Sequence, residues 1–241
     1  MTTPQAHYDR LLAKHYSWMF GVPFEQKVRE QAELLSRLGI GEPGVSVDLG
    51  CGSGFQAIAL ADLGAERVHA IDTSGALLAE LRDHAADRPI VTYERDLLSF
   101  AEVLDGYADM IVCMGDTLTH LASKSDASAL FANIASCLSD GGRLVLTWRD
   151  LSSPPAGLNR FIPLRSTDDK MMVCFLEDQG ETVMVHDLVH VRGEAGWQFE
   201  RSAYPKLKLS PAWVRDQLVA VDLSVAHEET LHGLSVIVAT R

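Results

Sequence analysis

The chain has 241 residues, of which 47% are hydrophobic and 22% are charged, and its formal net charge is −12. This length and composition predict one elaborated globular domain. The negative charge argues against a surface that neutralises phosphates, so we expect a small-molecule partner and no nucleic acid. The four cysteines form no CxxC pair, which suggests neither a zinc site nor a disulfide framework. There is no apolar run of about 18 residues and no export signal, so we expect a cytoplasmic protein that does not bind membranes.

Short apolar runs alternate with helical patterns over the first 150 residues, as in a parallel sheet built from βαβ units. The predicted strands are Val45–Leu49, Arg67–Ile71, Ile90–Tyr93, Asp109–Met114 and Leu144–Trp148. The predicted helices cover 24–38, 54–63, a segment beginning after Thr73-Ser74, and a segment that carries Leu130, Ile134 and Leu138 and stops at Gly141-Gly142.

The pattern changes after Trp148, because residues 152–169 are rich in Ser, Pro and Arg and the β-like runs that follow have no helix between them. Ser210-Pro211 is typical of a helix start. We therefore predict an α/β fold, a doubly wound, mostly parallel seven-stranded sheet with an antiparallel β insertion after the fifth strand. The insertion runs are Met171–Leu176, Thr182–Val191 and Trp197–Tyr204, and the closing strands lie near 221–226 and 234–239.

Glycines are concentrated in VDLGCGSG, residues 47–54, where the first strand turns into a helix. Glycine lets the backbone approach a ligand closely. The same kind of turn binds dinucleotides, so a nicotinamide-dependent oxidoreductase is the alternative. Two features disfavour this oxidoreductase alternative. The spacing from Gly50 is G-x-G-x-G rather than G-x-G-x-x-G, and Asp48 would face a pyrophosphate unfavourably.

Further polar residues follow the next strands. Asp72 ends the second strand about 20 residues after the glycine turn, where a carboxylate can bind both hydroxyls of a ribose. Asp96 follows the third strand and can accept a hydrogen bond from an adenine amine, with Leu97 against the ring. Met114-Gly115-Asp116 ends the fourth strand. The carboxyl ends of parallel strands meet at one edge, so these residues are expected to lie together where such sheets bind ligands.

This set of motifs resembles the class I S-adenosylmethionine-dependent methyltransferases over roughly residues 44–150. VDLGCGSG is similar to the family's glycine motif, Asp72 to its ribose-binding acid, and RDLL to its adenine-contacting pair. MGDTLTHL and GGRLVLTWRDLS are similar to segments of glycine and sarcosine N-methyltransferases. The resemblance implies methyl transfer from S-adenosylmethionine, with S-adenosylhomocysteine as product, to N or O of a small molecule rather than to C or S. A protein that binds the cofactor without turnover is a further alternative.

The resemblance also implies a set of residues that bind the cofactor at the sheet edge. Family members often place an N-terminal aromatic over the methionine portion, and the candidates here are Tyr8, Tyr16 and Trp18. For Asp48, binding a ligand and shaping the turn are both open. The predicted cofactor-binding residues are Tyr16, Trp18, Asp48, Gly50, Cys51, Gly52, Gly54, Asp72, Thr73, Asp96, Leu97, Met114, Gly115 and Asp116.

Two residues beyond the fourth and fifth strands are predicted to act on the acceptor. His120 follows the fourth strand, and an imidazole can exchange a proton near neutral pH, although a polar residue at a helix start is the alternative. Arg149 follows the fifth strand and suits an anionic acceptor. A dedicated base is optional, because the cofactor itself carries the activated methyl group.

The insertion supplies the remaining candidates for substrate binding, which are Arg160, Arg165, His186 and Tyr204. For the two arginines, a solvated loop is the alternative. His186 and His190 are four residues apart, but on a strand this spacing is about 13 Å, so one metal ion cannot bind both and no metal is expected.

We expect a single methyltransferase domain over residues 1–241, present as a monomer or a homodimer. Its segments are an N-terminal helical region over 1–40, a cofactor-binding core over 41–150, an insertion or lid over the acceptor site at 151–209, and the last helix with the closing strands at 210–241.

Overall fold

The computed structural model describes residues 4–241, with all of their side chains except those of Pro4, Gln5, Tyr8, Asp9, Ala13, Tyr16 and Ser17. The chain divides into two compact units. Unit 1 comprises Met1–Val22 and Leu151–Lys208, and unit 2 comprises Pro23–Asp150 and Leu209–Arg241. Each unit is built around a sheet of its own.

Unit 2 contains a seven-stranded sheet in which the five strands from β5 to β3 are parallel, while beyond β5 the pairings of β5 with β11 and of β11 with β10 are antiparallel. This confirms the predicted doubly wound, mostly parallel sheet. In the order in which they pair, the strands are β10 (Ser224–Leu231), β11 (Leu234–Thr240), β5 (Leu138–Trp148), β4 (Ala108–Cys113), β1 (Val45–Leu49), β2 (Arg67–Asp72) and β3 (Ile90–Glu94).

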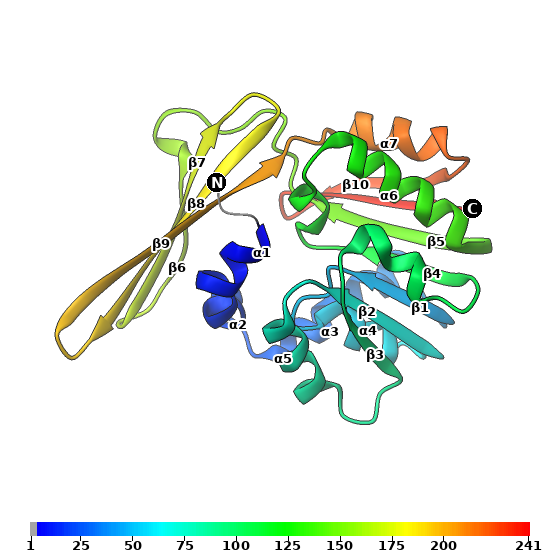
Figure 1. Ribbon diagram of the computed structural model, residues 1–241, viewed down its shortest axis with the longest axis horizontal. Helices are drawn as coiled ribbons and strands as arrows, with labels where there is room; N and C mark the ends of the chain where they lie inside the picture. The colour runs from blue at the N-terminus through cyan, green and yellow to red at the C-terminus, as the bar shows by residue number, and fades with distance from the viewer. Residues whose placement is uncertain (1–3) are drawn as a thin grey trace. The chain divides into compact units, whose positions relative to one another are not determined.

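The central strands are apolar and buried, as expected where helices cover both faces of a parallel sheet. Leu49, Ile111 and Leu146 have no exposed surface. Figure 1 shows α6 and α7 on one face and α3 and α4 on the other, and α3 packs against α4 as α6 does against α7. The helices are α3 (Phe24–Arg37), α4 (Phe55–Asp62), α5 (Gly75–Ala85), α6 (Lys124–Cys137) and α7 (Pro211–Ala220), with short turns η3 (Leu97–Val103) and η4 (Thr117–His120).

Serine side chains cap the helices at the positions that the sequence predicts. The hydroxyl of Ser74 accepts a hydrogen bond from the backbone N–H of Leu77 at the start of α5. Ser210 does the same for Trp213, with Pro211 in the first turn of α7. Such caps satisfy backbone donors that have no partner within the helix.

Two element boundaries differ from the prediction. Helix α6 ends at Cys137 instead of continuing to Gly141, because Leu138 is buried and pairs with Ala108 of β4, so that it belongs to β5. The first closing strand begins at Ser224 rather than near 221, because the backbone N–H of Asp222 bonds back to Val219 in a turn that ends α7. At the end of α6 tertiary pairing overrides the local pattern, whereas after α7 a local backbone turn delays the start of the strand.

Unit 1 contains a four-stranded antiparallel sheet, which confirms the predicted insertion. Its first strand, β6, was not predicted. Pro163 lies within β6, and proline is tolerated there because β6 is an edge strand with an irregular register between Pro163 and Arg165. The strands are β6 (Phe161–Ser166), β7 (Lys170–Asp178), β8 (Thr182–Gly193) and β9 (Gly196–Leu207), with η5 (Gly157–Arg160) before them.

The N-terminal segment packs on one face of this sheet, which we call the inner face. Leu11 and Leu12 form an apolar cluster with Met172 of β7 and Val189 of β8. Polar contacts accompany this cluster, since the guanidinium of Arg10 donates to the Ser202 hydroxyl of β9 at 2.9 Å. The segment consists of α1 (Pro4–His7), η1 (Tyr8–Leu12), η2 (Ala13–His15) and α2 (Tyr16–Phe20).

Among the helices in residues 4–241, none is both long enough and apolar enough to cross a membrane.

Candidate functional site

The glycine turn joins β1 to α4 at the carboxyl edge of the unit 2 sheet. Gly50, Gly52 and Gly54 all have positive φ angles, a conformation that side chains disfavour. The backbone N–H groups of Gly50 and Cys51 donate to the carbonyl of Ile71 in β2, at 2.8 and 3.0 Å. The turn is therefore fastened to the neighbouring strand by its own backbone.

Neighbouring elements approach two of these glycines too closely to leave room for a side chain. A Cβ at Gly50 would lie 2.2 Å from Cγ2 of Thr117 in η4, and a Cβ at Gly54 would lie 2.1 Å from Leu81 in α5. The hydroxyl of Thr117 also donates to the Gly50 carbonyl at 3.3 Å. These glycines allow the loops after β1 and β4 and helix α5 to converge.

Asp72, at the end of β2, connects the glycine turn to the start of α5. One oxygen of its carboxylate accepts a hydrogen bond from the Gly52 N–H and the other accepts one from the Ser74 N–H, both at 2.8 Å. Thr73 lies between these contacts and is half-buried. The predicted acid therefore lies beside the glycine turn, about 20 residues after it in the chain as a ribose-binding carboxylate requires.

Asp48 is a buried carboxyl group beneath the same turn, with 1% of its surface exposed. Burial, and secondarily the charge of Asp72, raises the pKa of Asp48 to about 8. A hydrogen bond from the Ala57 backbone N–H lowers this pKa, but its effect is the smallest of the three. Within residues 4–241, its Oδ2 atom has no hydrogen-bond partner, and the same holds for the fully buried Ser53 hydroxyl. Unsatisfied buried polar atoms are unusual, and two in one turn point to a ligand as their partner.

The donors and acceptors of this turn fit S-adenosylmethionine better than a dinucleotide. Residues 47–54 contain no Lys or Arg, while Asp48 and Asp72 supply carboxyl groups. S-adenosylmethionine carries cationic ammonium and sulfonium groups and hydroxyls that donate, whereas a pyrophosphate is an anion that the Asp72 carboxylate would repel. The cofactor that the sequence implies therefore matches the charge of the turn.

Asp96 and Leu97 follow β3 at the same edge of the sheet. The exposed Asp96 caps η3, since its carboxylate accepts from the Leu98 N–H at 2.8 Å. Leu97 is half-buried at the start of that turn. Their positions at the sheet edge are those predicted, while contact with an adenine ring stays a prediction.

The loops after β4 and β5 are tied to one another. The Gly115 N–H donates to the Thr147 hydroxyl of β5 at 2.7 Å, and the Asp116 carboxylate accepts from the Arg149 N–H at 2.9 Å. Met114, at the start of this loop, is buried. Because β1, β4 and β5 are neighbours in the sheet, these loops lie next to the glycine turn.

The two residues predicted to act on the acceptor also lie at this edge. His120 is half-buried and ends η4, the turn whose Thr117 contacts Gly50. The exposed side chain of Arg149 extends toward the β10–β11 turn, with Nη1 3.6 Å from the Cβ position of Gly233. Since β11 and β1 are on opposite sides of β5, the Arg149 side chain points away from the glycine turn.

The other candidates for substrate binding belong to unit 1. Tyr204 is buried and stacks on the ring of His7 at 4.2 Å, and His186 contacts the Glu177 carboxylate at 3.2 Å. The Arg160 guanidinium lies over the Phe175 ring at 5.0 Å. That of Arg165 lies over the Trp18 ring at 4.9 Å and donates to the Trp18 carbonyl.

These contacts leave the predicted roles of the unit 1 residues in substrate binding as predictions. The same holds for Trp18 as the aromatic over the cofactor. The Tyr8 and Tyr16 side chains, the other aromatic candidates, lie outside the described residues.

The structure adds residues that sequence reasoning missed. Thr117 and Thr147 position the β4 loop, and although they lie within MGDTLTHL and GGRLVLTWRDLS, the pattern of these segments does not reveal that role. In unit 1, the buried His7 lies 2.9 Å from the buried carboxylate of Asp187. The two residues are 180 positions apart, so no sequence spacing signals this pair.

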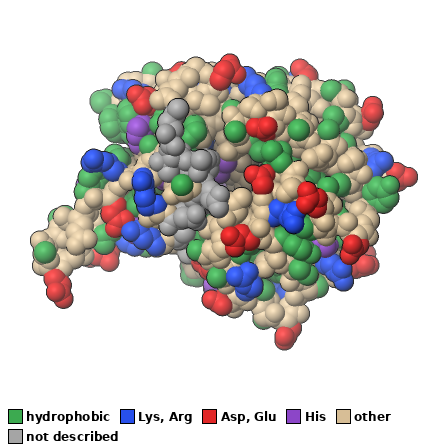
Figure 2. Space-filling model, viewed as in Figure 1, with side chains coloured by type: hydrophobic (Ala, Val, Ile, Leu, Met, Phe, Trp, Pro, Cys, Tyr) green, Lys and Arg blue, Asp and Glu red, His purple; other side chains and the backbone are tan. Residues whose placement is uncertain are grey.

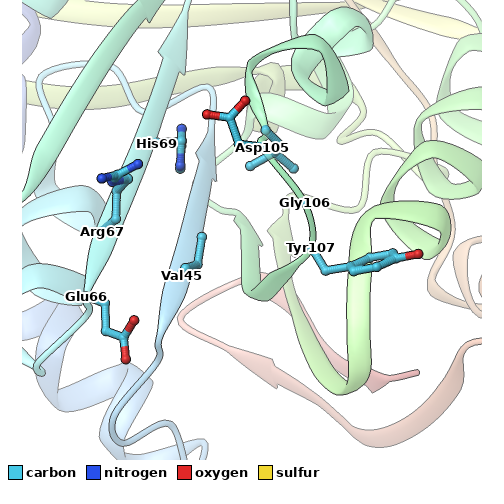
Figure 3. Close-up of a pocket in the computed structure, with 8 residues that line it drawn as sticks. Val45, Glu66, Arg67, His69, Asp105, Gly106 and Tyr107 are labelled. Atoms are coloured by element: carbon cyan, nitrogen blue, oxygen red, sulfur yellow. The ribbon is translucent and has the colours of Figure 1, made fainter.

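A hollow lies at the opposite edge of the unit 2 sheet from the glycine turn, near the amino ends of β1 and β2 (Figure 3). Glu66, Arg67 and Asp105 surround it with both signs of charge, and burial lowers the pKa of His69 beside them. On the face of unit 2 seen in Figure 2, acidic and basic side chains are likewise interspersed. Within residues 4–241, no three His, Cys, Asp or Glu side chains are grouped so as to hold a metal ion.

Comparisons with known proteins agree with this geometry. Residues 47–142 match the family described as methyltransferase domain. The match assigns this segment, which is less than half of the chain, to a methyltransferase domain. The methyltransferase domain includes the glycine turn, Asp72, Asp96 and the loop after β4, and it ends within β5.

Curated relatives and solved structures extend the comparison beyond the methyltransferase domain. Cypemycin N-terminal methyltransferase from Streptomyces sp is 29% identical over 136 residues, which are 52% of this chain and 54% of that protein. Glycine/sarcosine N-methyltransferase from Aphanothece halophytica is 28% identical over 106 residues, 43% of this chain and 40% of that protein. The match thus spans about half or less of the curated relatives' length.

A solved structure covers almost the whole chain. The amino pentose methyltransferase of calicheamicin biosynthesis from Micromonospora echinaspora, solved with S-adenosylmethionine bound, has a TM-score of 0.74 and 19% identity over 95% of this chain and 96% of its own. At this identity the likeness shows the fold alone. All of these proteins are methyltransferases, so the nicotinamide-dependent oxidoreductase gains no support.

The raised pKa of Asp48 leads to a pH-dependent stability that can be measured. The ordinary pKa of 3.8 applies in the unfolded chain, so between about pH 4 and about pH 8 unfolding releases a proton that the folded state retains. The free energy of unfolding of the wild type, relative to that of Asp48→Asn, should therefore fall as pH rises through this window and level off above about pH 8. Urea unfolding over a pH series measures it.

The exposed Asp83 of α5 provides the control, since Asp83→Asn should leave the pH dependence of the wild type unchanged. A constant stability difference between wild type and Asp48→Asn from pH 4 to pH 8 would contradict the raised pKa.

Proposed function

We propose that this chain transfers the methyl group of S-adenosylmethionine to a nitrogen or oxygen atom of a small molecule, most directly an amine. The observation that carries the proposal is the glycine turn with its two carboxyl groups. Asp48 supplies a buried oxygen that has no partner within residues 4–241, and Asp72 presents a carboxylate at the sheet edge. Both suit a cationic, hydroxyl-bearing ligand.

Different residues of unit 2 would bind the cofactor and take part in the reaction. The glycine turn and Asp72 would hold the cofactor, and Asp96 with Leu97 would select its adenine end. The bound cofactor supplies an activated methyl group, so the protein has mainly to orient the acceptor and to exclude water. His120, at the end of η4, is the residue that we propose takes a proton from the acceptor.

The relatives support an amine as acceptor. The name of the glycine/sarcosine enzyme specifies methylation of nitrogen, the name of the cypemycin enzyme specifies an N-terminus, where a peptide carries its amine, and the calicheamicin enzyme is named for an amino pentose. A neutral amine attacks without a strong base, which agrees with a site where one histidine is the only proposed proton acceptor. An anionic group elsewhere on the acceptor would suit Arg149.

The proposal is tested by incubating the purified protein with methyl-labelled S-adenosylmethionine and a metabolite extract, followed by mass spectrometry of the products. A labelled product together with S-adenosylhomocysteine is expected. Cofactor binding without any labelled product from extracts of several sources would indicate a binding protein without turnover. Absence of both binding and product would overturn the proposal.

Replacing the proposed ribose-binding acid should weaken cofactor binding. Asp72→Asn removes a charged acceptor from a partly buried site, so the Kd for S-adenosylhomocysteine should rise at least about tenfold. Isothermal titration calorimetry measures this, with circular dichroism to check folding. Asp62→Asn, a substitution of an exposed acid in α4, is the matched control and should leave the Kd unchanged. An unchanged Kd in Asp72→Asn would place the ribose contact elsewhere.

Arg149 separates acceptor binding from cofactor binding, because its side chain points away from the glycine turn. Arg149→Met should raise the acceptor KM about tenfold while the Kd for S-adenosylhomocysteine changes less than about twofold. Arg215→Met, a substitution of an exposed arginine in α7, is the control. A large loss of cofactor affinity in a folded Arg149→Met protein would contradict this division.

A further inference from the structure

Unit 2 has a hollow at the amino edge of its sheet, opposite the edge that carries the glycine turn, and we call it the amino-edge hollow (Figure 3). Its volume is about 260 Å³. Pockets for drug-sized ligands measure roughly 300 to 1,000 Å³, so this hollow suits a smaller molecule. The residues that line it all belong to unit 2 and are Val45, Glu66, Arg67, His69, Leu104, Asp105, Gly106 and Tyr107.

Two parallel strands form one wall of the hollow. Val45 of β1 pairs with Arg67 of β2, and Val47 pairs with His69. Paired side chains, and side chains two residues apart on one strand, point to the same side of a sheet, so Val45, Arg67 and His69 share a face. The loop after η3 supplies the other wall, and Figure 3 shows the Asp105 carboxylate directed toward the side on which His69 lies.

His69 is a buried imidazole in this wall, with 5% of its surface exposed. Its Nδ1 atom lies 3.2 Å from the Tyr93 hydroxyl, and the two rings stack with centroids 5.7 Å apart. Burial, and secondarily the charge of Arg67, lower the pKa of His69, against the smaller effect of Asp105. The ring is therefore neutral near pH 7, and its Nε2 atom, which makes no hydrogen bond within residues 4–241, can donate to a ligand or accept from it.

The charged side chains around the hollow do not neutralise one another. Glu66, Arg67 and Asp105 are exposed, and within residues 4–241 none of the three side chains forms an ion pair. A guanidinium binds a carboxylate through paired hydrogen bonds, and a carboxylate binds an ammonium group. A ligand that carries both groups would satisfy both signs, whereas a ligand with a single charge would leave one sign without a partner.

We propose that the amino-edge hollow binds a small zwitterion, an L-amino acid with an apolar side chain. The Arg67 guanidinium would bind its carboxylate and the Asp105 carboxylate would bind its ammonium group. Val45 and Leu104 are the apolar lining residues that its side chain would contact. Glu66 adds a second negative charge, which favours a ligand that retains its amine. This site does not depend on the proposed methyl transfer.

The proposed site is separate from the edge of the sheet that carries the cofactor motifs. Strand β2 joins the two edges, since it begins with Arg67 at the hollow and ends with Asp72 at the glycine turn. Its six residues rise about 3.3 Å each, so its ends are about 17 Å apart. An amino acid could also enter the site for the methionine portion of the cofactor, and the test has to separate the two places.

The test is isothermal titration calorimetry of the intact chain with L-leucine and with L-phenylalanine, without and with saturating S-adenosylhomocysteine. At least one of these probes should bind with a Kd of about 1 mM or lower under both conditions. Isocaproate, which is leucine without its amine, and isoamylamine, which is leucine without its carboxylate, should bind at least about tenfold more weakly than leucine. Probe binding that persists when S-adenosylhomocysteine does not bind would support the hollow while contradicting the proposed methyl transfer.

Variants of the two charged partners locate the bound probe. Arg67→Gln and Asp105→Asn should each raise its Kd at least about tenfold and leave the Kd for S-adenosylhomocysteine unchanged. Both side chains are exposed, so folding should survive, as circular dichroism can check. The matched controls are Arg215→Gln in α7 and Asp83→Asn in α5, substitutions of exposed residues away from the hollow that should keep the probe affinity of the wild type.

Three results would overturn the proposal. The first is the absence of binding by either probe at about 10 mM, a concentration that would reveal a Kd of about 1 mM. The second is a probe affinity that is the same in Arg67→Gln, Asp105→Asn and the wild type. The third is loss of probe binding in the presence of S-adenosylhomocysteine, which would place the probe in the cofactor site.

Discussion

The candidate site depends on the carboxylate of Asp72, which holds the end of β2 against the turn that follows β1. Its two oxygens accept from the N–H groups of Gly52 and Ser74, so one side chain sets both the glycine turn and the start of α5. The Ile71 carbonyl adds two backbone bonds to the same turn. The close contacts of Gly50 and Gly54 follow, because the elements around the turn then converge at one place.

This arrangement has an electrostatic consequence. Asp48 and Asp72 lie close enough for the charge of one to raise the pKa of the other, and burial adds to that effect at Asp48. The charge of Asp72 beside the buried Asp48 is unfavourable, and a ligand with positive charge and hydroxyl donors would reduce this repulsion. The same feature makes the turn unsuitable for a phosphate-bearing ligand, even though its glycine spacing is close to that of a dinucleotide-binding turn.

Unit 1 has a different constraint, since its four-stranded sheet has two faces and other elements must shield the apolar side chains on them. The N-terminal segment covers the inner face with Leu11 and Leu12, and it adds polar contacts such as Arg10 to Ser202 and His7 to Asp187. The near-continuous apolar run from Met171 to Leu176 is consistent with this, because both the inward and the outward residues of β7 are apolar. A strand covered on one face alone would alternate.

The sequence by itself determined the class of fold and the sheet-edge positions of the cofactor motifs. Glycine turns, strand ends and serine caps are local signals, so VDLGCGSG, Asp72 and Ser210-Pro211 all lie where the pattern predicts. Strand β6 was not predicted, because Pro163 is compatible with a strand only at the edge of a sheet. The end of α6 was misplaced, because Leu138 pairs with Ala108 and so belongs to β5. Tertiary structure alone decided three features, which are the high pKa of Asp48, the Thr117–Gly50 contact and the His7–Asp187 pair. Each depends on groups that are distant in the chain and that only packing brings together.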